Sequence, residues 1–246
     1  MQKYVGFTCF RVSNGRTLPL EMHGDRAIQC YRSIGLELDK KQAKSLFEEK
    51  AKGIALQGDF KVKVSFYAEP LDFKFEVNKI NPKEFLTVKL EQELENWPAN
   101  NLLKNFDYTN RRSHLEKLPD VDECLYFKDE NKILDATYSS FFALSGDKLH
   151  FGTNKSQQVL GIFRRRLISY AYKLGLSIVE SDISLSDLES FDCAFLTNDV
   201  QRIRGIKEIV GSKSILFDLK KLSPMMKNVN DILSNEEREL CQQNLF

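Results

Sequence analysis

The sequence predicts a mixed α/β (α+β) fold divided into two domains. Some segments carry apolar residues at the spacing of amphipathic helices, and others alternate apolar with polar residues, as half-buried strands do. Both patterns occur in each half of the chain, which favours a mixed fold over a pure class. Residues 95–101 combine turn formers with a proline. We expect them to link an N-terminal α/β domain of residues 1–97 to a C-terminal α/β domain of residues 98–246.

The N-terminal domain is expected to hold four strands and two helices. A β-rich stretch at residues 4–12 leads into Ser13-Asn14-Gly15-Arg16, which predicts a strand followed by a turn. Helical spacing over residues 20–36 ends at Gly35, and Asp39 is placed to cap a second helix that ends before Gly53. Alternation then predicts strands at residues 60–67, 71–77 and 85–94.

The C-terminal domain is expected to interleave helices with short strands. Helices are predicted at residues 102–118, 158–174, 186–190 and 234–245. Strands are predicted at residues 123–128, 133–144, 148–151, 177–181, 193–197, 203–210 and 214–218.

Composition excludes several classes of protein. The 36 basic and 35 acidic residues among 246 leave a formal net charge of +1, which argues against a strongly basic nucleic-acid binder. No apolar run reaches the roughly 18 residues of a transmembrane helix. The first residues also lack the apolar core of a signal peptide. We therefore expect a cytoplasmic protein that binds neither membranes nor nucleic acid.

The cysteines and histidines support neither a disulfide framework nor a metal site. The five cysteines are scattered and never in CxxC spacing, and the three histidines are far apart. We expect the thiols to be reduced and no metal to be bound. The chain also lacks P-loop, G-x-G-x-x-G, H-E-x-x-H and G-x-S-x-G motifs.

A series of short blocks is more informative than these motifs. In the second half they are Leu103-Lys104-Asn105-Phe106-Asp107-Tyr108, Asp122-Glu123-Cys124-Leu125, Asp135-Ala136-Thr137-Tyr138-Ser139-Ser140, Leu160-Gly161-Ile162-Phe163-Arg164 and Phe195-Leu196-Thr197-Asn198. The first half adds Phe7-Thr8-Cys9-Phe10-Arg11-Val12 and Leu20-Glu21-Met22-His23. Their order and spacing resemble the class IV aminotransferases, pyridoxal phosphate enzymes of fold type IV. The resemblance covers roughly residues 4–210.

The resemblance implies a two-domain fold like that of D-amino acid aminotransferase, with the cofactor between the domains, and a homodimer. The family includes aminodeoxychorismate lyase, whose F-T-T form is closest to Phe7-Thr8-Cys9. The expected function is therefore conversion of 4-amino-4-deoxychorismate to 4-aminobenzoate and pyruvate, in folate synthesis. Two alternatives stay open: an aminotransferase acting on branched-chain or D-amino acids, and a degenerate, non-enzymatic member that has lost the cofactor.

Lys104 matches the lysine that carries the cofactor in this family. An aldehyde cofactor needs one primary amine fixed in the site, and the same amine can move the proton of the substrate α-carbon. The alternative for any one lysine is a solvated surface position.

Asp135 matches the carboxylate that pairs with the cofactor's pyridine nitrogen. A buried carboxylate keeps that nitrogen protonated, so that the ring can accept electrons. The family usually has Glu here, which is one methylene longer. The alternative is an ordinary turn aspartate.

The phosphate group is expected at a helix N-terminus formed by Gly161, Ile162 and Phe163, where free backbone N–H groups favour an anion. Asn198 matches a second phosphate-side loop. Three departures weaken this match: Phe163 replaces a threonine, Ser140 an asparagine, and Asp199 a residue that is often Ser or Thr.

The family's D-R-G block, whose arginine binds the phosphate, is not found before the Phe7 strand. Lys61 or Lys63 is expected to substitute, and Lys63 matches an arginine of short relatives. Tyr108 matches a tyrosine that can hydrogen-bond the cofactor ring. Thr8 and Tyr138 are the candidate residues for lining the substrate pocket.

Overall fold

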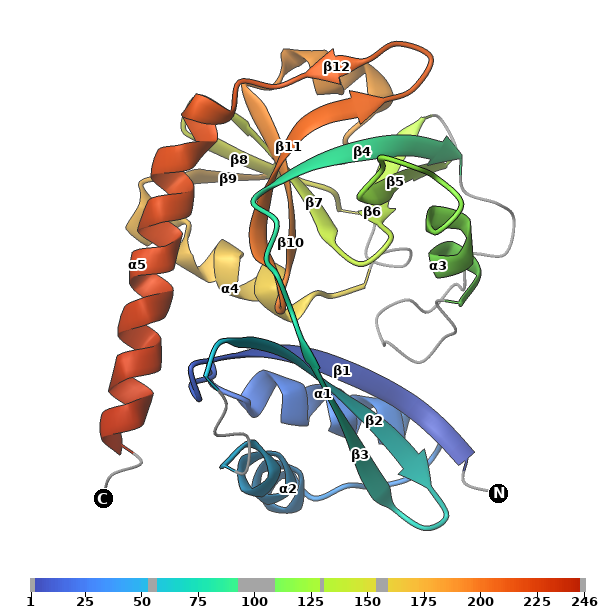
Figure 1. Ribbon diagram of the computed structural model, residues 1–246, viewed down its shortest axis with the longest axis vertical. Coiled ribbons are helices and arrows are strands. Elements are labelled where there is room, and N and C mark those ends of the chain that lie inside the picture. Colours follow the sequence, from blue (N-terminus) through green and yellow to red (C-terminus); the bar gives the residue numbers. More distant parts are fainter. Residues whose placement is uncertain (1–2, 53–56, 93–108, 129–130, 154–158, 244–246) are drawn as a thin grey trace. The chain divides into compact units, whose positions relative to one another are not determined.

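The computed structural model describes residues 3–52, 57–92, 109–128, 131–153 and 159–243 (Figure 1). Contacts divide these residues into two compact units. The first unit holds the residues up to Pro82 together with those from Asp231 onward. The second unit holds the described residues from Lys83 to Asn230. Each unit has its own apolar core.

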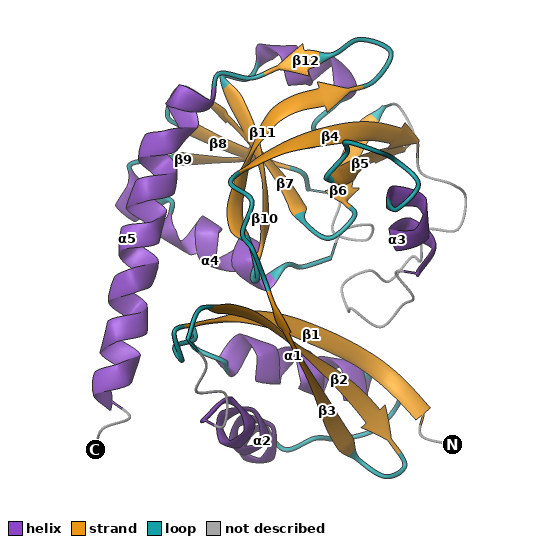
Figure 2. Cartoon of the chain, in the orientation of Figure 1, coloured by secondary structure: helices purple, strands orange, loops and turns teal. Residues whose placement is uncertain are grey.

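The first unit is an antiparallel three-stranded sheet with two helices. The strands β1 (Lys3–Ser13), β2 (Asp59–Ala68) and β3 (Asp72–Lys79) pair in the order β1-β2-β3. Helices α1 (Glu21–Arg32) and α2 (Lys40–Lys52) lie on one face of this sheet (Figure 2). The Asp39 carboxylate accepts hydrogen bonds from the backbone N–H groups of Lys41 and Gln42, at 2.9 and 3.1 Å. The predicted cap of α2 is therefore confirmed.

Aromatic rings fill the space between these helices and the sheet. Phe47 of α2 is fully buried. Its ring centroid lies 5.6 Å from that of Phe73, 6.3 Å from those of Phe66 and Phe75, and 6.5 Å from that of Phe10. Most of these pairs are edge-to-face, the arrangement that the ring quadrupole favours. Phe47 therefore joins all three strands to α2.

The second unit is built on a nine-stranded sheet. Its strands are β4 (Phe85–Gln92), β5 (Glu123–Lys128), β6 (Lys132–Ala136), β7 (Ser140–Ser145), β8 (Lys148–Phe151), β9 (Ser177–Glu180), β10 (Cys193–Asn198), β11 (Arg202–Val210) and β12 (Ile215–Leu216). They follow the order β6-β5-β4-β11-β10-β7-β8-β9, and β12 pairs with β11. Its helical elements are α3 (Thr109–Leu115), α4 (Ile162–Tyr170), two short 3-10 turns, Tyr172–Leu174 and Leu185–Ser190, and the first part of α5 (Leu219–Gln243), whose residues from Asp231 onward belong to the first unit.

Strand β4 belongs to this second sheet rather than to the first. It runs parallel to β11 on one side and to β5 on the other. The N-terminal domain expected from the sequence included this strand, because its alternating pattern continues that of β2 and β3. The division by contacts falls after Pro82, while residue 97 lies outside the described residues.

Three further elements differ from the sequence expectations. The stretch 133–144 is two strands, because the chain turns between Ala136 and Ser140. The helix expected at 158–174 begins at Ile162 and gives way to a 3-10 turn at Tyr172. Helix α5 begins at Leu219 rather than at residue 234, despite the internal Pro224. Its buried residues recur at helical spacing and outweigh the proline: Leu222, Met225, Met226, Val229 and Leu233.

Among the described residues, no helix is both long and apolar enough to cross a membrane.

Replacing Phe47 by alanine is expected to lower the free energy of unfolding of the first unit by about 3–5 kcal/mol, since it removes a fully buried ring and leaves a cavity. Urea unfolding followed by circular dichroism measures the change. The control is Leu36→Ala, because Leu36 is 38% exposed. Equal effects of the two substitutions would contradict the packing described for Phe47.

Candidate functional site

The Asp135 carboxylate is buried at the end of β6 with one oxygen in need of a donor. Its Oδ2 accepts a hydrogen bond from the Val159 backbone N–H at 3.1 Å. Its Oδ1 has no hydrogen-bond partner among the described residues. Buried polar atoms nearly always have partners, and an exception calls for a ligand or a functional reason. Asp135 is thus not the solvated turn aspartate that the sequence left open.

Burial raises the pKa of Asp135 to about 6. The positive charges of Arg164 and Arg111 and hydrogen bonds from the Val159 N–H and the Ser140 side chain pull this pKa downward, and burial outweighs them. A cation placed against Oδ1 would favour the ionised form further.

A hydrogen bond connects the Asp135 carboxylate to the segment that leads into α4. Val159, which binds Asp135, comes two residues before Gly161, the N-cap of α4. Among the described residues no side chain caps this helix, and the N–H groups of Ile162 and Phe163 point out of its first turn without intrahelical acceptors. A Cβ on Gly161 would lie 3.1 Å from Ser140 Oγ, which favours glycine there. The geometry suits an anion.

Asn198 uses its side chain to shape the loop after β10. Its Oδ1 accepts hydrogen bonds from the backbone N–H groups of Val200 and Gln201, at 3.0 and 2.7 Å. Its Nδ2 donates to Ser139 Oγ at 2.9 Å. These three hydrogen bonds already use much of the hydrogen-bonding capacity of the side-chain amide. The contact expected between Asn198 and the phosphate stays a prediction.

Asp199 is buried beside Arg166 of α4, with Nε and Oδ1 3.9 Å apart. Their side chains are only 6% and 7% exposed. The guanidinium partly neutralises the carboxylate, which reduces the repulsion that Asp199 would exert on a nearby anion.

A buried ion pair that the sequence analysis missed supports these loops. Arg204 of β11 contacts Glu123 of β5 through Nη2 and Oε1. Arg204 also donates to Ser139 Oγ at 2.8 Å, and Ser139 donates to Glu123 Oε1 at 2.8 Å. The Tyr138 N–H binds the second Glu123 oxygen at 3.0 Å. The available signal was a charged residue next to apolar ones: Glu123 precedes Cys124-Leu125-Tyr126-Phe127, and Arg204 stands between Ile203 and Gly205-Ile206.

Two of the predicted residues lie in the first unit. Thr8 is fully buried, and its Oγ1 lies 2.8 Å from His23 Nδ1. Direct contact with substrate would require exchange of this hydrogen bond. Lys63 is on the opposite, more exposed face, where its Nζ lies 3.3 Å from Glu76 Oε1. Its predicted role in binding phosphate would require release of Glu76.

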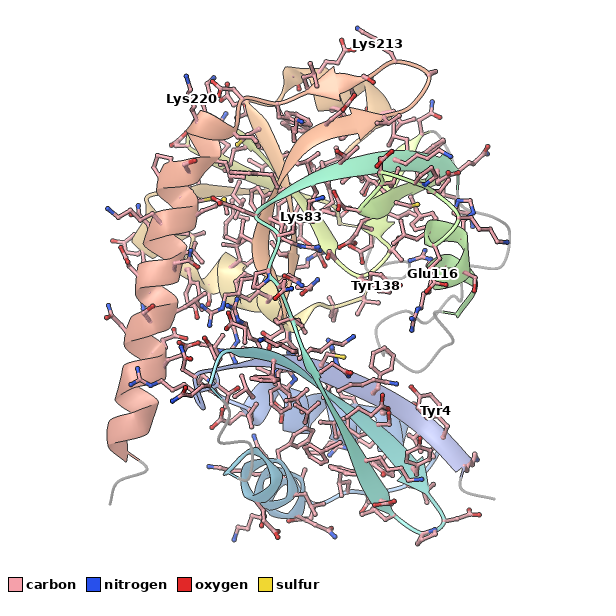
Figure 3. All side chains as sticks on the ribbon, in the orientation of Figure 1. Tyr4, Lys83, Glu116, Tyr138, Lys213 and Lys220 are labelled. Atoms are coloured by element: carbon pink, nitrogen blue, oxygen red, sulfur yellow. The ribbon has the colours of Figure 1, made fainter. Side chains whose placement is uncertain are left out.

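The remaining predicted residues stand as follows. Lys104 and Tyr108 lie outside the described residues. Tyr138, labelled in Figure 3, is 40% exposed and so can reach a ligand in solvent. The second unit therefore brings together Asp135, the α4 N-terminus and, through Ser139, Asn198.

The described residues fit pyridoxal phosphate at two of its ends. Asp135 Oδ1 lacks the donor that a protonated pyridine nitrogen provides. The uncapped N-terminus of α4 offers backbone donors to a phosphate. The Asp199 carboxylate fits less well, and Arg166 compensates for part of its charge.

Comparison with known proteins agrees with this geometry. Residues 6–209 match the model of the family described as amino-transferase class IV. A protein named as a candidate 4-amino-4-deoxychorismate lyase from Legionella pneumophila superposes with a TM-score of 0.77 at 20% identity, covering 94% of this chain and 90% of that one. The branched-chain aminotransferase of Thermoproteus uzoniensis gives a TM-score of 0.78 at 17% identity, covering 96% and 87%. The expected α/β fold is confirmed.

Curated relatives match a shorter part of the chain. A "probable branched-chain-amino-acid aminotransferase" of Rickettsia conorii is 28% identical over 107 residues, and that of Rickettsia felis matches to the same extent. The aligned segment is 43% of this chain but only 37% of each relative.

Asp135 is expected to make the stability of the cofactor-free protein depend on pH. Its pKa of about 6 in the folded protein is above the unfolded value of about 3.9, so the folded state binds more protons between these values. Stability should therefore fall by about 2 kcal/mol as pH rises from 4 to 7. Urea titrations across this range should show this component in the wild type and not in Asp135→Asn. Identical pH profiles would contradict the burial of an ionisable carboxyl at this position.

Breaking the buried ion pair is expected to be costly. Glu123→Gln should lower the free energy of unfolding by about 3–5 kcal/mol, because it leaves the Arg204 charge uncompensated. Adding Arg204→Met should cost less than the sum of the single changes. Glu189→Gln is the control: its partner Lys213 is 76% exposed, so the loss should be within about 1 kcal/mol. Additive losses in the double variant would show that the two groups do not interact.

Proposed function

The chain belongs to the amino-transferase class IV family, and on that premise we propose that it is a pyridoxal phosphate-dependent enzyme, an aminodeoxychorismate lyase. The reaction converts 4-amino-4-deoxychorismate to 4-aminobenzoate and pyruvate. The observation that carries the cofactor site is the buried Oδ1 of Asp135, which lacks a donor among the described residues.

The chain's own residues have separate tasks in this proposal. When bound, pyridoxal phosphate supplies an electron sink for charge that develops at the substrate α-carbon. Asp135 accepts a hydrogen bond from the ring nitrogen and holds its proton in place. The N–H groups of Ile162 and Phe163 bind the phosphate at the positive end of α4. Lys63 and Asn198 are proposed as further phosphate-side groups.

Lys104 is the proposed catalytic base. Its Nζ takes the proton from the substrate α-carbon and delivers it during release of pyruvate. This assignment rests on the Lys104-Asn105-Phe106 block in the sequence. Tyr108 is proposed to hydrogen-bond the ring hydroxyl of the cofactor, and Tyr138 to contact the substrate.

The choice of a lyase rests on the Phe7-Thr8-Cys9 block, together with the likeness in fold to the Legionella protein. The second candidate is an aminotransferase acting on branched-chain or D-amino acids. The matches to the Rickettsia proteins favour its branched-chain form. The proposal also includes a homodimer, on the family resemblance, and a cytoplasmic location, since the cysteines at positions 9, 30, 124 and 193 are free thiols.

Borohydride reduction with pyridoxal phosphate, followed by peptide mass mapping, tests the cofactor site. The expected result is one pyridoxyl adduct, on Lys104. The Lys104→Ala variant should show neither this adduct nor enzymatic activity. Lys83→Ala is the control, because Lys83 is exposed and paired with Asp122. Label spread over surface lysines, with Lys104 unmodified, would overturn the assignment of Lys104.

An assay with and without a keto-acid acceptor separates the two activities. A lyase should release 4-aminobenzoate from 4-amino-4-deoxychorismate without any acceptor. An absolute requirement for a keto acid, with turnover of leucine or a D-amino acid, would instead establish the aminotransferase.

A further inference from the structure

Three side chains with metal-binding atoms meet on the second unit. Glu91 lies on β4, His114 in the last turn of α3, and Cys124 on β5. One oxygen of Glu91, one ring nitrogen of His114 and the sulfur of Cys124 all lie within 4.8 Å of one another. They are 23 and 10 residues apart in the sequence, so their spacing predicts no metal motif.

The parallel pairing of β4 with β5 brings two of these groups to one face of the sheet. Lys89 is the register partner of Cys124, and Glu91 that of Tyr126. Residues two apart on a strand share a face, so Glu91 and Cys124 point to the same side. Leu115 of α3 packs on the small core that contains Cys124, and the preceding His114 is thereby held at the sheet.

The donor set suits a borderline divalent cation. Zinc binds thiolate, imidazole and carboxylate groups, in tetrahedral geometry. Two N and O ligands at zinc distances are separated by about 3.4 Å along a tetrahedral edge. His114 Nε2 and Glu91 Oε1 are already 3.2 Å apart. We propose that Glu91, His114 and Cys124 form a binding site for Zn²⁺, with water as the fourth ligand.

The surroundings of the cluster show how a metal ion could reach it and which group would compete with the ion for Glu91. Cys124 is fully buried, whereas the side chains of Glu91 and His114 are 22% and 45% exposed, so an ion can approach from solvent. The Lys89 ammonium lies 2.7 Å from Glu91 Oε1 and competes with the metal for this oxygen. The Lys89 side chain is 36% exposed, so it can turn to water when the ion binds.

A bound ion would fasten α3 to two strands of the sheet. Helix α3 has only seven residues, and the described contacts that hold it are the apolar packing of Leu115, the Arg111 stack on Tyr126 and the His114–Glu91 pair. The site is independent of the proposed lyase reaction, because none of its residues has a part in that reaction. We expect its role to be structural.

Titration of the purified holoenzyme with Co²⁺ tests the site, because cobalt replaces zinc and reports its ligands in the absorption spectrum. The expected result is one Co²⁺ per chain, with a thiolate-to-metal charge-transfer band and displacement by Zn²⁺. Cys124→Ser should abolish the band. His114→Ala should weaken binding by at least about tenfold, the lower end of the loss seen when even an outer-shell partner is removed.

Two further variants keep the test selective. Cys193→Ser alters a buried cysteine outside the cluster and should leave the titration unchanged. Lys89→Met removes the competing cation and should tighten Co²⁺ binding about two- to fivefold. Absence of stoichiometric binding in the wild type, or a charge-transfer band that persists in Cys124→Ser, would overturn the proposal. His114→Ala keeps the test decisive if Cys124→Ser fails to fold.

Discussion

The buried contact between Glu123 and Arg204 is the constraint on which the second unit depends. The two side chains come from β5 and β11, the strands that flank β4 in the sheet. Neither charge could remain buried without the other, because the desolvation of a lone ion costs several kcal/mol. Ser139 and the Tyr138 N–H add further hydrogen bonds to the Glu123 carboxylate, and Ser139 also accepts one from Arg204. The pair thereby fixes the β6–β7 turn and, through Asn198, the end of β10.

The candidate cofactor site lies beside this ion pair and combines residues from strands, loops and one helix. Asp135 ends a strand, and the Val159 N–H that binds it belongs to the approach to α4. The hydrogen bond from Val159 thus brings the carboxylate close to the chain that leads into the helix N-terminus, although the two are far apart in sequence. The first offers negative charge and the second positive, so together they can orient a ligand whose ends carry opposite charges.

Local pattern predicted most of the elements but not how they pair. Alternation located β2, β3 and β4 correctly, yet nothing in the alternation of β4 says that its partners are β5 and β11. Those contacts are long-range, and their register depends on both partners. In the same way, the long buried stripe of α5 was hidden by Pro224, a residue that ends most helices.

The sequence pointed to residues whose chemistry gives them a reason to stand in a family block, and it did not reveal residues whose role is structural. Asp135 is buried, as a carboxylate that pairs with a ring nitrogen must be. Thr8 was expected to face a pocket, but side chains alternate along β1, and its face is the one that packs on the helices. Arg204 was overlooked, because its partner Glu123 is far away in the sequence and only the folded chain brings them together.

The two strands that pair with β4 are synthesised at very different times. Its hydrogen-bonding partner β5 follows soon after it, but its other partner, β11, begins only at Arg202. At 5–20 residues per second, roughly 6–20 s pass between synthesis of the two strands. During that interval one edge of β4, with the apolar residues Leu86 and Val88, has no neighbour. A nascent chain of this protein therefore carries an open strand edge until β11 has been synthesised.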